Sequence, residues 1–199
     1  MNSGKYTVKR LHCCRIGAKG IMGDAVAAPD AHAMNRLLKI FMDICLLRAG
    51  PQHLPASRFL LTLTLVMHAA LGVVFALFTL PLPQALVAAA IGTALLVGVV
   101  QALLLVHGKA ERVQQTATAL AGSEILLGLL ALLPTAWFYT VESNDARVLP
   151  SLLSLLAIVW SVVVTVHIFR AALQVSQGMA LLFALGYTIM AYSVLGLVV

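Results

Sequence analysis

Long apolar stretches separated by short polar segments make up most of the chain after its first third. Five of them have the roughly 20 residues that a helix needs to cross a bilayer core of about 30 Å. They are residues 59–80, 84–106, 118–137, 150–169 and 178–199. None alternates apolar and polar residues as membrane β-strands do, and backbone groups in lipid must bond within their own segment. The pattern therefore predicts an all-α polytopic membrane protein with a five-transmembrane-helix bundle over residues 58–199.

The links between these stretches are short, at residues 81–83, 107–117, 140–149 and 170–177. Short links make consecutive helices antiparallel neighbours. Pro81 and Pro83 argue against one continuous helix through the first link. Pro134 falls near the end of its span, where the loss of a backbone hydrogen bond is tolerated.

Composition supports a membrane protein and excludes several other classes. Hydrophobic residues make up 61% of the chain and charged residues only 10%, against about 45–50% and 25% in soluble domains. A soluble enzyme, a disordered regulator and a disulfide-stabilised mini-protein are therefore excluded. The chain has no zinc-protease, phosphate-loop or serine-hydrolase motif, so we expect a non-enzymatic protein without a cofactor or metal. The net charge of +6 fits membrane topology and anionic lipid better than nucleic acid.

The distribution of cations predicts the orientation. Placing the N-terminus in the cytoplasm puts every one of the 13 Lys and Arg residues except Arg147 on the cytoplasmic side, as the positive-inside rule requires. Five spans then put the C-terminus in the periplasm. Compact loops and dense Leu and Ala usage suggest the inner membrane of a bacterium.

The N-terminal third divides into two parts. Residues 1–33 are basic and lack apolar periodicity, so we expect either a disordered cytoplasmic tail or an extension from an upstream start. Residues 34–57 form an amphipathic juxtamembrane helix and a proline-containing elbow, with Gly50 as the expected helix C-cap and Pro51 as the stop. The face of this helix opposite Arg36, Lys39 and Asp43 is apolar. It carries Leu37, Leu38, Phe41, Ile44 and Cys45.

Two placements of this helix are open. In the first it lies on the anionic cytoplasmic leaflet as an interfacial helix. In the second it packs against the cytoplasmic end of the bundle, and both can hold together. The cations expected to contact the membrane surface are Arg36, Lys39, Arg48 and Arg58.

The three cysteines predict neither a metal site nor a disulfide. Cys13 and Cys14 are adjacent, but no second pair of ligands completes a zinc site. Cys45 lies on the apolar face of the juxtamembrane helix, where palmitoylation is conceivable but a buried inert thiol is favoured. None of the three is expected on the oxidising side of the membrane.

Polar side chains within the spans are the candidate functional residues, because ionisable groups in a membrane are costly. Glu124 has the small neighbours Ala121 and Gly128 on its helical face, so we expect its carboxylate to face protein. His68 shares a ridge with Gly72 and Ala76.

His167 and Gln101 also fall in or near the cytoplasmic half, so four residues could form one polar cluster: Glu124, His68, Gln101 and His167. The functional interpretation is a proton or cation relay, or a polar ligand pocket. The structural interpretation is a set of interhelical hydrogen bonds that fix register, or snorkelling to the interface for Glu124 and His167. The different depths of His68 and His167 argue against a bis-histidine haem.

Residues 46–199 resemble the Yip-domain family of membrane proteins in having five closely spaced spans after a basic N-terminal segment. Gly50-Pro51 stands where that family has an acidic-Leu-Tyr-Gly-Pro signature, although the acidic and tyrosine positions differ here. The resemblance implies a scaffolding or trafficking role.

The sequence therefore predicts a non-enzymatic integral membrane protein that acts as an accessory, scaffolding or assembly factor. Its expected partners are the lipid bilayer and another membrane protein or a second copy of itself. The alternative is a small transporter or channel for a proton-coupled or cationic solute that uses Glu124 and His68. A third possibility is an accessory subunit of a respiratory or similar complex. A cavity that reaches Glu124 would favour transport, and a fully packed bundle with a flat apolar side would favour the accessory role.

Overall fold

The structure is a computed structural model that describes residues 31–198, and expectations for residues 1–30, including Cys13 and Cys14, lie outside it. Six α-helices and two short 3-10 helices follow one another along the described chain. They are α1 (Ala31–Cys45), η1 (Pro51–His53), α2 (Arg58–Ala76), α3 (Leu82–Val106), η2 (Ala110–Arg112), α4 (Val113–Thr140), α5 (Asn144–Leu173) and α6 (Gln177–Val198).

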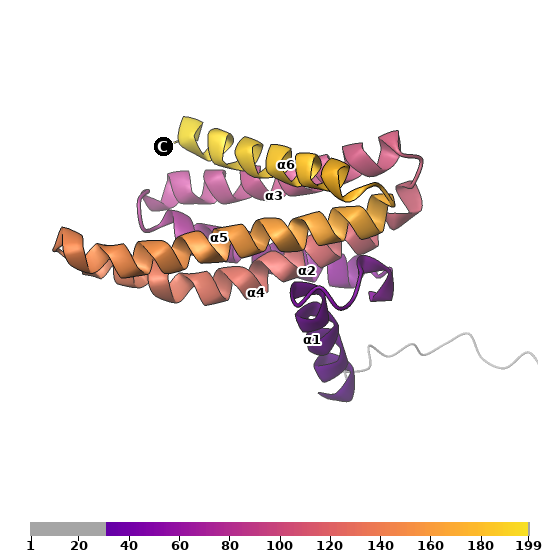
Figure 1. The fold of residues 1–199 in the computed structure, drawn as a ribbon, viewed down its shortest axis with the longest axis horizontal. Coiled ribbons are helices and arrows are strands. Elements are labelled where there is room, and N and C mark those ends of the chain that lie inside the picture. Colours follow the sequence, from indigo (N-terminus) through magenta and orange to yellow (C-terminus); the bar gives the residue numbers. More distant parts are fainter. Residues whose placement is uncertain (1–30, 199) are drawn as a thin grey trace, which may run out of the picture.

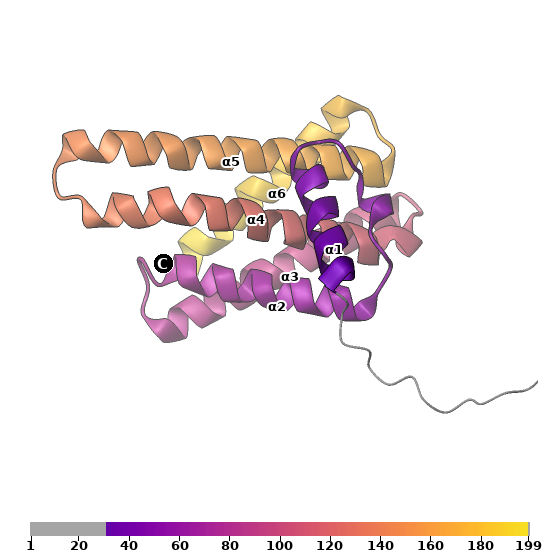
Figure 2. The same cartoon turned by 90° about the horizontal axis from the view of Figure 1, so that it is seen from below.

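Five of these helices, α2 to α6, are long and apolar enough to cross a membrane, which confirms the predicted all-α bundle. Helices α2 to α5 run roughly along one axis (Figure 1), and α6 crosses them obliquely (Figure 2). The most extensive contacts join the five helices in the order α2, α4, α5, α6, α3 and back to α2, and α3 also contacts α4 directly. The loops at one end of the bundle, at residues 54–57, 107–112 and 174–176, mark what we call the base, and the α2–α3 and α4–α5 turns mark the far end.

The helices α4 and α5 are longer than the apolar stretches that predicted them. The polar segment from residue 140 to 149 was expected to be a link, but α4 continues to Thr140 and α5 begins at Asn144. The Ser143 hydroxyl caps α5 by accepting a hydrogen bond from the Ala146 amide at 3.4 Å, so the helix starts in polar sequence. At the base, α4 likewise begins at Val113, before the apolar stretch. As a result, the α4–α5 hairpin projects beyond the other helices at the far end (Figure 1).

The densest packing lies in the half of the bundle nearest the base. Every α4 residue from Thr116 to Ser123 is buried. Large side chains from the other helices fill the space around it, including Leu96, Leu104, Ile168 and Phe169. Toward the far end, α4 exposes Leu129, Leu130 and Leu133, as expected of a helix that faces lipid there.

The first helix lies across the bundle, at a steep angle to the other helices and against α4 and α5 (Figure 2). Phe41, Ile44 and Cys45 are buried against the bundle, whereas Arg36 and Lys39 are exposed. Leu38, Met42 and Leu46 form a second apolar stripe that stays exposed. The packed placement is therefore observed, and the exposed stripe leaves the interfacial placement open as a prediction.

Side chains from the bundle hold the elbow between α1 and α2 by its backbone carbonyls. Trp160 of α5 donates from Nε1 to the Cys45 carbonyl at 3.2 Å. His167 donates from Nε2 to the Ala49 carbonyl at 2.9 Å, and Gln115 donates to the Leu54 carbonyl at 3.0 Å. Since these carbonyls lie at the end of α1 or beyond it and need partners when covered, the contacts fix the end of α1 on the bundle.

The predicted C-cap at Gly50 is wrong. The helix ends earlier, and Leu47 is the residue that takes the left-handed conformation, with φ 61°. The Arg48 amide bonds the Asp43 carbonyl at 2.8 Å and the Leu47 amide bonds the Ile44 carbonyl at 3.0 Å, which is the Schellman pattern. Gly50 instead has φ −105° and precedes η1. The turn tolerates leucine because Leu47 packs against the core.

Candidate functional site

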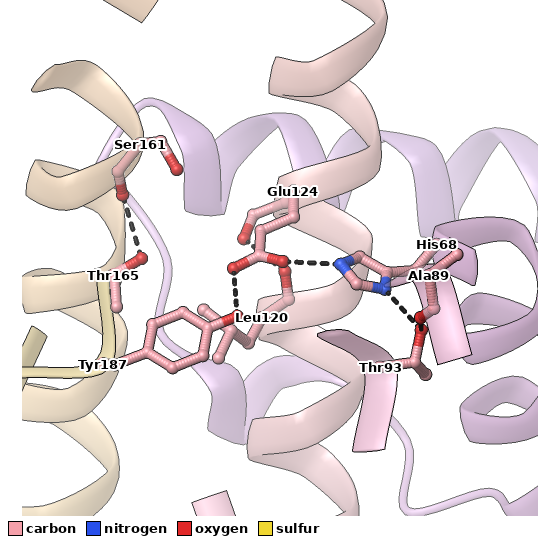
Figure 3. Close-up of polar contacts among 9 residues, drawn as sticks. His68, Ala89, Thr93, Leu120, Glu124, Ser161, Thr165 and Tyr187 are labelled. Atoms are coloured by element: carbon pink, nitrogen blue, oxygen red, sulfur yellow. Dashed lines mark hydrogen bonds and ion pairs between the residues drawn. The ribbon is translucent and has the colours of Figure 1, made fainter. Parts of the chain in front are cut away.

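The centre of the bundle holds a direct contact between the two strongest sequence candidates. His68 of α2 and Glu124 of α4 meet with Nε2 and Oε2 2.7 Å apart. Glu124 lies between His68 and Tyr187, with the side chains pointing toward one another from different helices (Figure 3). The small residues around Glu124 permit this approach, because a Cβ on Gly128 would lie 2.7 Å from the Leu71 side chain of α2.

Thr93 of α3 supports the other side of the imidazole. Its Oγ1 lies 3.2 Å from His68 Nδ1, and its hydroxyl donates to the Ala89 carbonyl at 2.9 Å. A hydroxyl has one proton to donate, so in this arrangement Thr93 accepts the Nδ1 proton of His68. In this arrangement Nδ1 of His68 carries a proton, and a Thr93 hydroxyl turned toward the ring would instead donate to Nδ1.

Tyr187 of α6 binds the second carboxylate oxygen of Glu124. Its hydroxyl donates to Oε1 at 3.0 Å, and its side chain is buried on the same face of α6 as Ala180 and Ala184. Glu124 is thus held from both sides, by an imidazole from α2 and a phenol from α6. Four of the five membrane-length helices meet in this one hydrogen-bonded group of Thr93, His68, Glu124 and Tyr187.

Three members of the group, His68, Glu124 and Tyr187, form the floor of a cavity of about 530 Å³. The cavity runs from His68, Glu124 and Tyr187 toward Thr79, Thr135 and Ser154, which lie nearer the far end. His68 and Glu124 retain 18% and 19% of their side-chain exposure, and they open into this space. The walls combine apolar side chains with hydroxyls, and no Lys or Arg lies among the described residues that line the cavity.

The structure does not bring His167 and Gln101 into this group. His167 donates from Nε2 to the Ala49 carbonyl and does not contact Glu124. Gln101 is exposed and borders a shallow groove between α2 and α3 on the outside of the bundle. Helical periodicity gave the depth of each residue but did not give the direction in which His167 and Gln101 face.

The four predicted membrane-surface cations, Arg36, Lys39, Arg48 and Arg58, are all exposed. They lie on or near α1 and at the start of α2, on the side of the molecule where the base is. Their exposure is compatible with a lipid headgroup surface. Their contact with lipid stays a prediction.

Sequence reasoning missed Tyr187 and Thr93 as members of the site. One usable signal was present for Tyr187, because Ala180, Ala184 and Tyr187 share one helical face that small residues mark as a packing face. Thr93 carries no such signal, since its role depends on the position of α2. Trp160 is exposed on α5 and donates a hydrogen bond to the end of α1.

Neither protein-family models, curated proteins nor solved structures give a match to this chain. The resemblance to the Yip-domain family therefore stays a prediction.

Proposed function

We propose that this integral membrane protein binds a small organic cation in its central cavity and carries it across the membrane, as the transporter alternative from the sequence expects. The observation that carries the proposal is the cavity itself, whose floor is the His68–Glu124–Tyr187 contact. Its volume falls within the roughly 300–1,000 Å³ of small-molecule sites. Small, mostly apolar cavities with a few convergent polar groups are the usual form of such sites.

The chemistry of the lining supports a cationic ligand. Glu124 is the only carboxylate among the lining residues that the structure describes, and no lysine or arginine accompanies it there. Phe75 and Tyr192 add aromatic surface, which attracts organic cations. An anionic ligand would meet a carboxylate and no fixed positive charge, so the lining disfavours it.

A purely structural role for the polar group explains less. Interhelical hydrogen bonds that only fix helix register need no space beside them, and protein interiors are normally packed without large voids. Here the space adjoins the ionisable pair, and hydroxyl groups continue along it through Ser161, Thr165 and Thr188. These hydroxyls can hydrate or coordinate a polar ligand on its way to Glu124.

The proposal is tested by uptake into liposomes that contain the purified protein. Radiolabelled tetramethylammonium and tetraethylammonium are two bilayer-impermeant monocations that differ in size. With an acidic lumen, we expect the wild-type protein to accumulate at least one of them in exchange for protons. Glu124→Gln should abolish uptake while retaining the fold, because it keeps the side-chain shape and removes the charge.

Glu142→Gln is the matched control, because Glu142 is an exposed carboxylate outside the cavity. It should transport as the wild type does. Uptake that is the same in Glu124→Gln as in the wild type, or no uptake of either cation, would contradict the proposal. The accessory or scaffolding role remains the competing prediction. A stoichiometric protein partner recovered from native membranes would support it.

A further inference from the structure

The hydrogen-bonded group at the floor of the cavity has a countable set of protons. Thr93 donates to the Ala89 carbonyl and accepts from His68 Nδ1. Tyr187 donates to Glu124 Oε1. One proton remains for the 2.7 Å gap between His68 Nε2 and Glu124 Oε2, whether it belongs to the carboxyl or to the imidazolium. While Thr93 donates to the Ala89 carbonyl, the absence of that proton would leave a nitrogen lone pair facing a carboxylate oxygen.

The group can release this proton without leaving a donor or acceptor unpaired. After the proton has left, the neutral His68 ring carries its single proton on Nε2, which donates to Glu124. Nδ1 has no proton in this state and accepts a hydrogen bond from Thr93. For this the Thr93 hydroxyl rotates from the Ala89 carbonyl to the imidazole, a movement of one hydrogen. The group then has one proton fewer and a net charge of −1, centred on the Glu124 carboxylate.

The surroundings make this charge costly unless a cation balances it. The titratable groups nearest Glu124 are His68 on α2 and the tyrosines Tyr187 and Tyr192 on α6. Cys45 of α1 adjoins Ser123, the neighbouring residue on α4. On α3 and α5 the groups that face the site are the hydroxyls of Thr93, Ser161 and Thr165. An isolated charge inside a membrane is strongly disfavoured, and none of these groups supplies a permanent positive charge.

Building on the proposed function, we infer that Glu124 holds either the proton it shares with His68 or a bound organic monocation, so that binding of one cation releases one proton. The balance is complete. The incoming cation brings one positive charge, the His68–Glu124 pair gives up one proton to solvent through the cavity, and the charge of the site with its occupant stays at zero. Tyr187 is a positioning residue that stabilises the carboxylate form.

Tyr187 should stabilise the cation-bound state more than the protonated state. Its hydroxyl donates to Glu124 in both states, but a hydrogen bond to a charged acceptor is about twice as strong as one to a neutral acceptor. Tyr187→Phe should therefore weaken cation binding about tenfold while the release of one proton is retained. Tyr139→Phe is the matched control, because Tyr139 is not among the residues that line the cavity and makes no hydrogen bond to Glu124 in the described structure.

Isothermal titration calorimetry of the purified full-length protein tests the inference, with tetraphenylphosphonium as the probe. Titrations in two buffers with different ionisation enthalpies give the number of protons released. We expect one proton per cation and an affinity that rises about tenfold per pH unit over the range in which the pair is protonated. Glu124→Gln should bind much more weakly and release no proton.

The outcomes separate the two proposals. Binding with no proton release, or an affinity independent of pH between pH 5 and 9, would overturn the exchange and leave cation binding intact. A Tyr187→Phe affinity equal to that of Tyr139→Phe would overturn the role of Tyr187. Failure of the wild-type protein to bind tetraphenylphosphonium, tetraethylammonium and tetramethylammonium would overturn cation binding itself. The melting temperature of each variant shows that it is folded.

Discussion

Gly122 of α4 lies directly against the Phe41 side chain of α1. A Cβ at this position would overlap the ring of Phe41, whereas a Cβ on Gly98 of α3 would meet nothing within 4 Å. The first glycine is therefore required by packing and the second is not.

We expect Gly122→Ala to lower the free energy of unfolding by about 1–3 kcal/mol, because overpacking forces Phe41 out of its place. Gly98→Ala should leave stability unchanged or raise it by up to about 1 kcal/mol, through the better helix propensity of alanine. Thermal denaturation in detergent, followed by circular dichroism, measures both. Equal melting temperatures for the two variants would show that α1 does not dock at Gly122.

Cys45 should be an unreactive thiol. Its Sγ lies 4.0 Å from the Ser123 carbonyl, and burial raises the pKa of the Cys45 thiol to about 11. At pH 7.5 the thiolate fraction is then about 0.0003, and only the thiolate reacts. In a Cys13→Ser, Cys14→Ser background, N-ethylmaleimide should label the folded protein far more slowly than the protein unfolded in SDS.

The same shift links Cys45 to stability at high pH. The folded state holds the thiol proton more tightly than the unfolded state, whose thiol has an ordinary pKa of about 9. The stabilisation is therefore complete below pH 9 and is lost as the pH rises toward 11. Labelling at the same rate in the folded and unfolded protein would contradict this burial. It would also reopen palmitoylation as an interpretation of Cys45.

At the residue scale, the sequence predicted best where the free-energy cost of burying a side chain in the membrane depends on the residue type alone. Glu124 is expensive in a membrane wherever it faces, so its small neighbours correctly indicated contact with protein. The hydrogen-bond partners around Glu124 could not be predicted, because tyrosine and threonine are common in membrane spans. Only the position of a neighbouring helix shows which of them meets a polar side chain. His167 and Gln101 show the reverse error, since depth alone placed them with Glu124.

At the scale of elements, the C-terminus of α5 is held by cations from the segment before α4. Lys109 donates from Nζ to the Leu173 carbonyl and to Gln174 Oε1, both at 2.7 Å. Arg112 donates to the Ala172 carbonyl at 3.3 Å. Gln174 ends the helix in the left-handed conformation, with φ 56°. The cations satisfy the carbonyls that a helix leaves unpaired at its C-terminus.

We expect Lys109→Met to lower the free energy of unfolding by about 1–2 kcal/mol, because two hydrogen bonds from a charged donor are lost. Arg170→Met is the control, since it removes an exposed cation from the last turn of α5 itself and should cost less than about 1 kcal/mol. Chemical denaturation of both variants gives the comparison. Equal losses would mean that net charge at the base matters and the specific contacts do not.

The contacts of Lys109 and Arg112 with the C-terminus of α5 give these two cations a structural role in addition to their role in topology. Lys109 and Arg112 entered the prediction as topology signals, and they additionally cap a neighbouring helix. Apolar runs predicted the membrane-length part of every helix. The polar extensions of α4 and α5 could not be seen in those runs, and the start of α5 depends on capping by Ser143 and not on hydrophobicity.

At the scale of the whole molecule, composition predicted a bundle but could not show whether its interior is filled. Five apolar helices can close into a solid bundle or around a space, and the difference lies in how a few small residues face one another. Near the base the other helices pack closely around α4. Toward the far end, residues such as Gly72, Gly92 and Ala88 border the cavity, and no side chain from another helix fills it.

If the cavity is open to water from the far end, its lining should react with a charged thiol reagent that lipid-facing residues at similar depth do not meet. In a background with Cys13, Cys14 and Cys45 replaced by serine or alanine, we expect Thr135→Cys to be modified by a methanethiosulfonate carrying a trimethylammonium group. Leu133→Cys should not react, because Leu133 is 75% exposed on the outside of α4, where lipid and not water would cover it.

The side from which the reagent acts then tests the topology together with the cavity. The positive-inside rule predicts that the far end faces the periplasm, so with that orientation intact cells should allow modification of Thr135→Cys. Modification only after the membrane is broken would reverse the predicted orientation and leave the cavity intact. Reaction of both cysteines at one rate would place water on the outer face of α4, and a bundle surrounded by lipid cannot have that property.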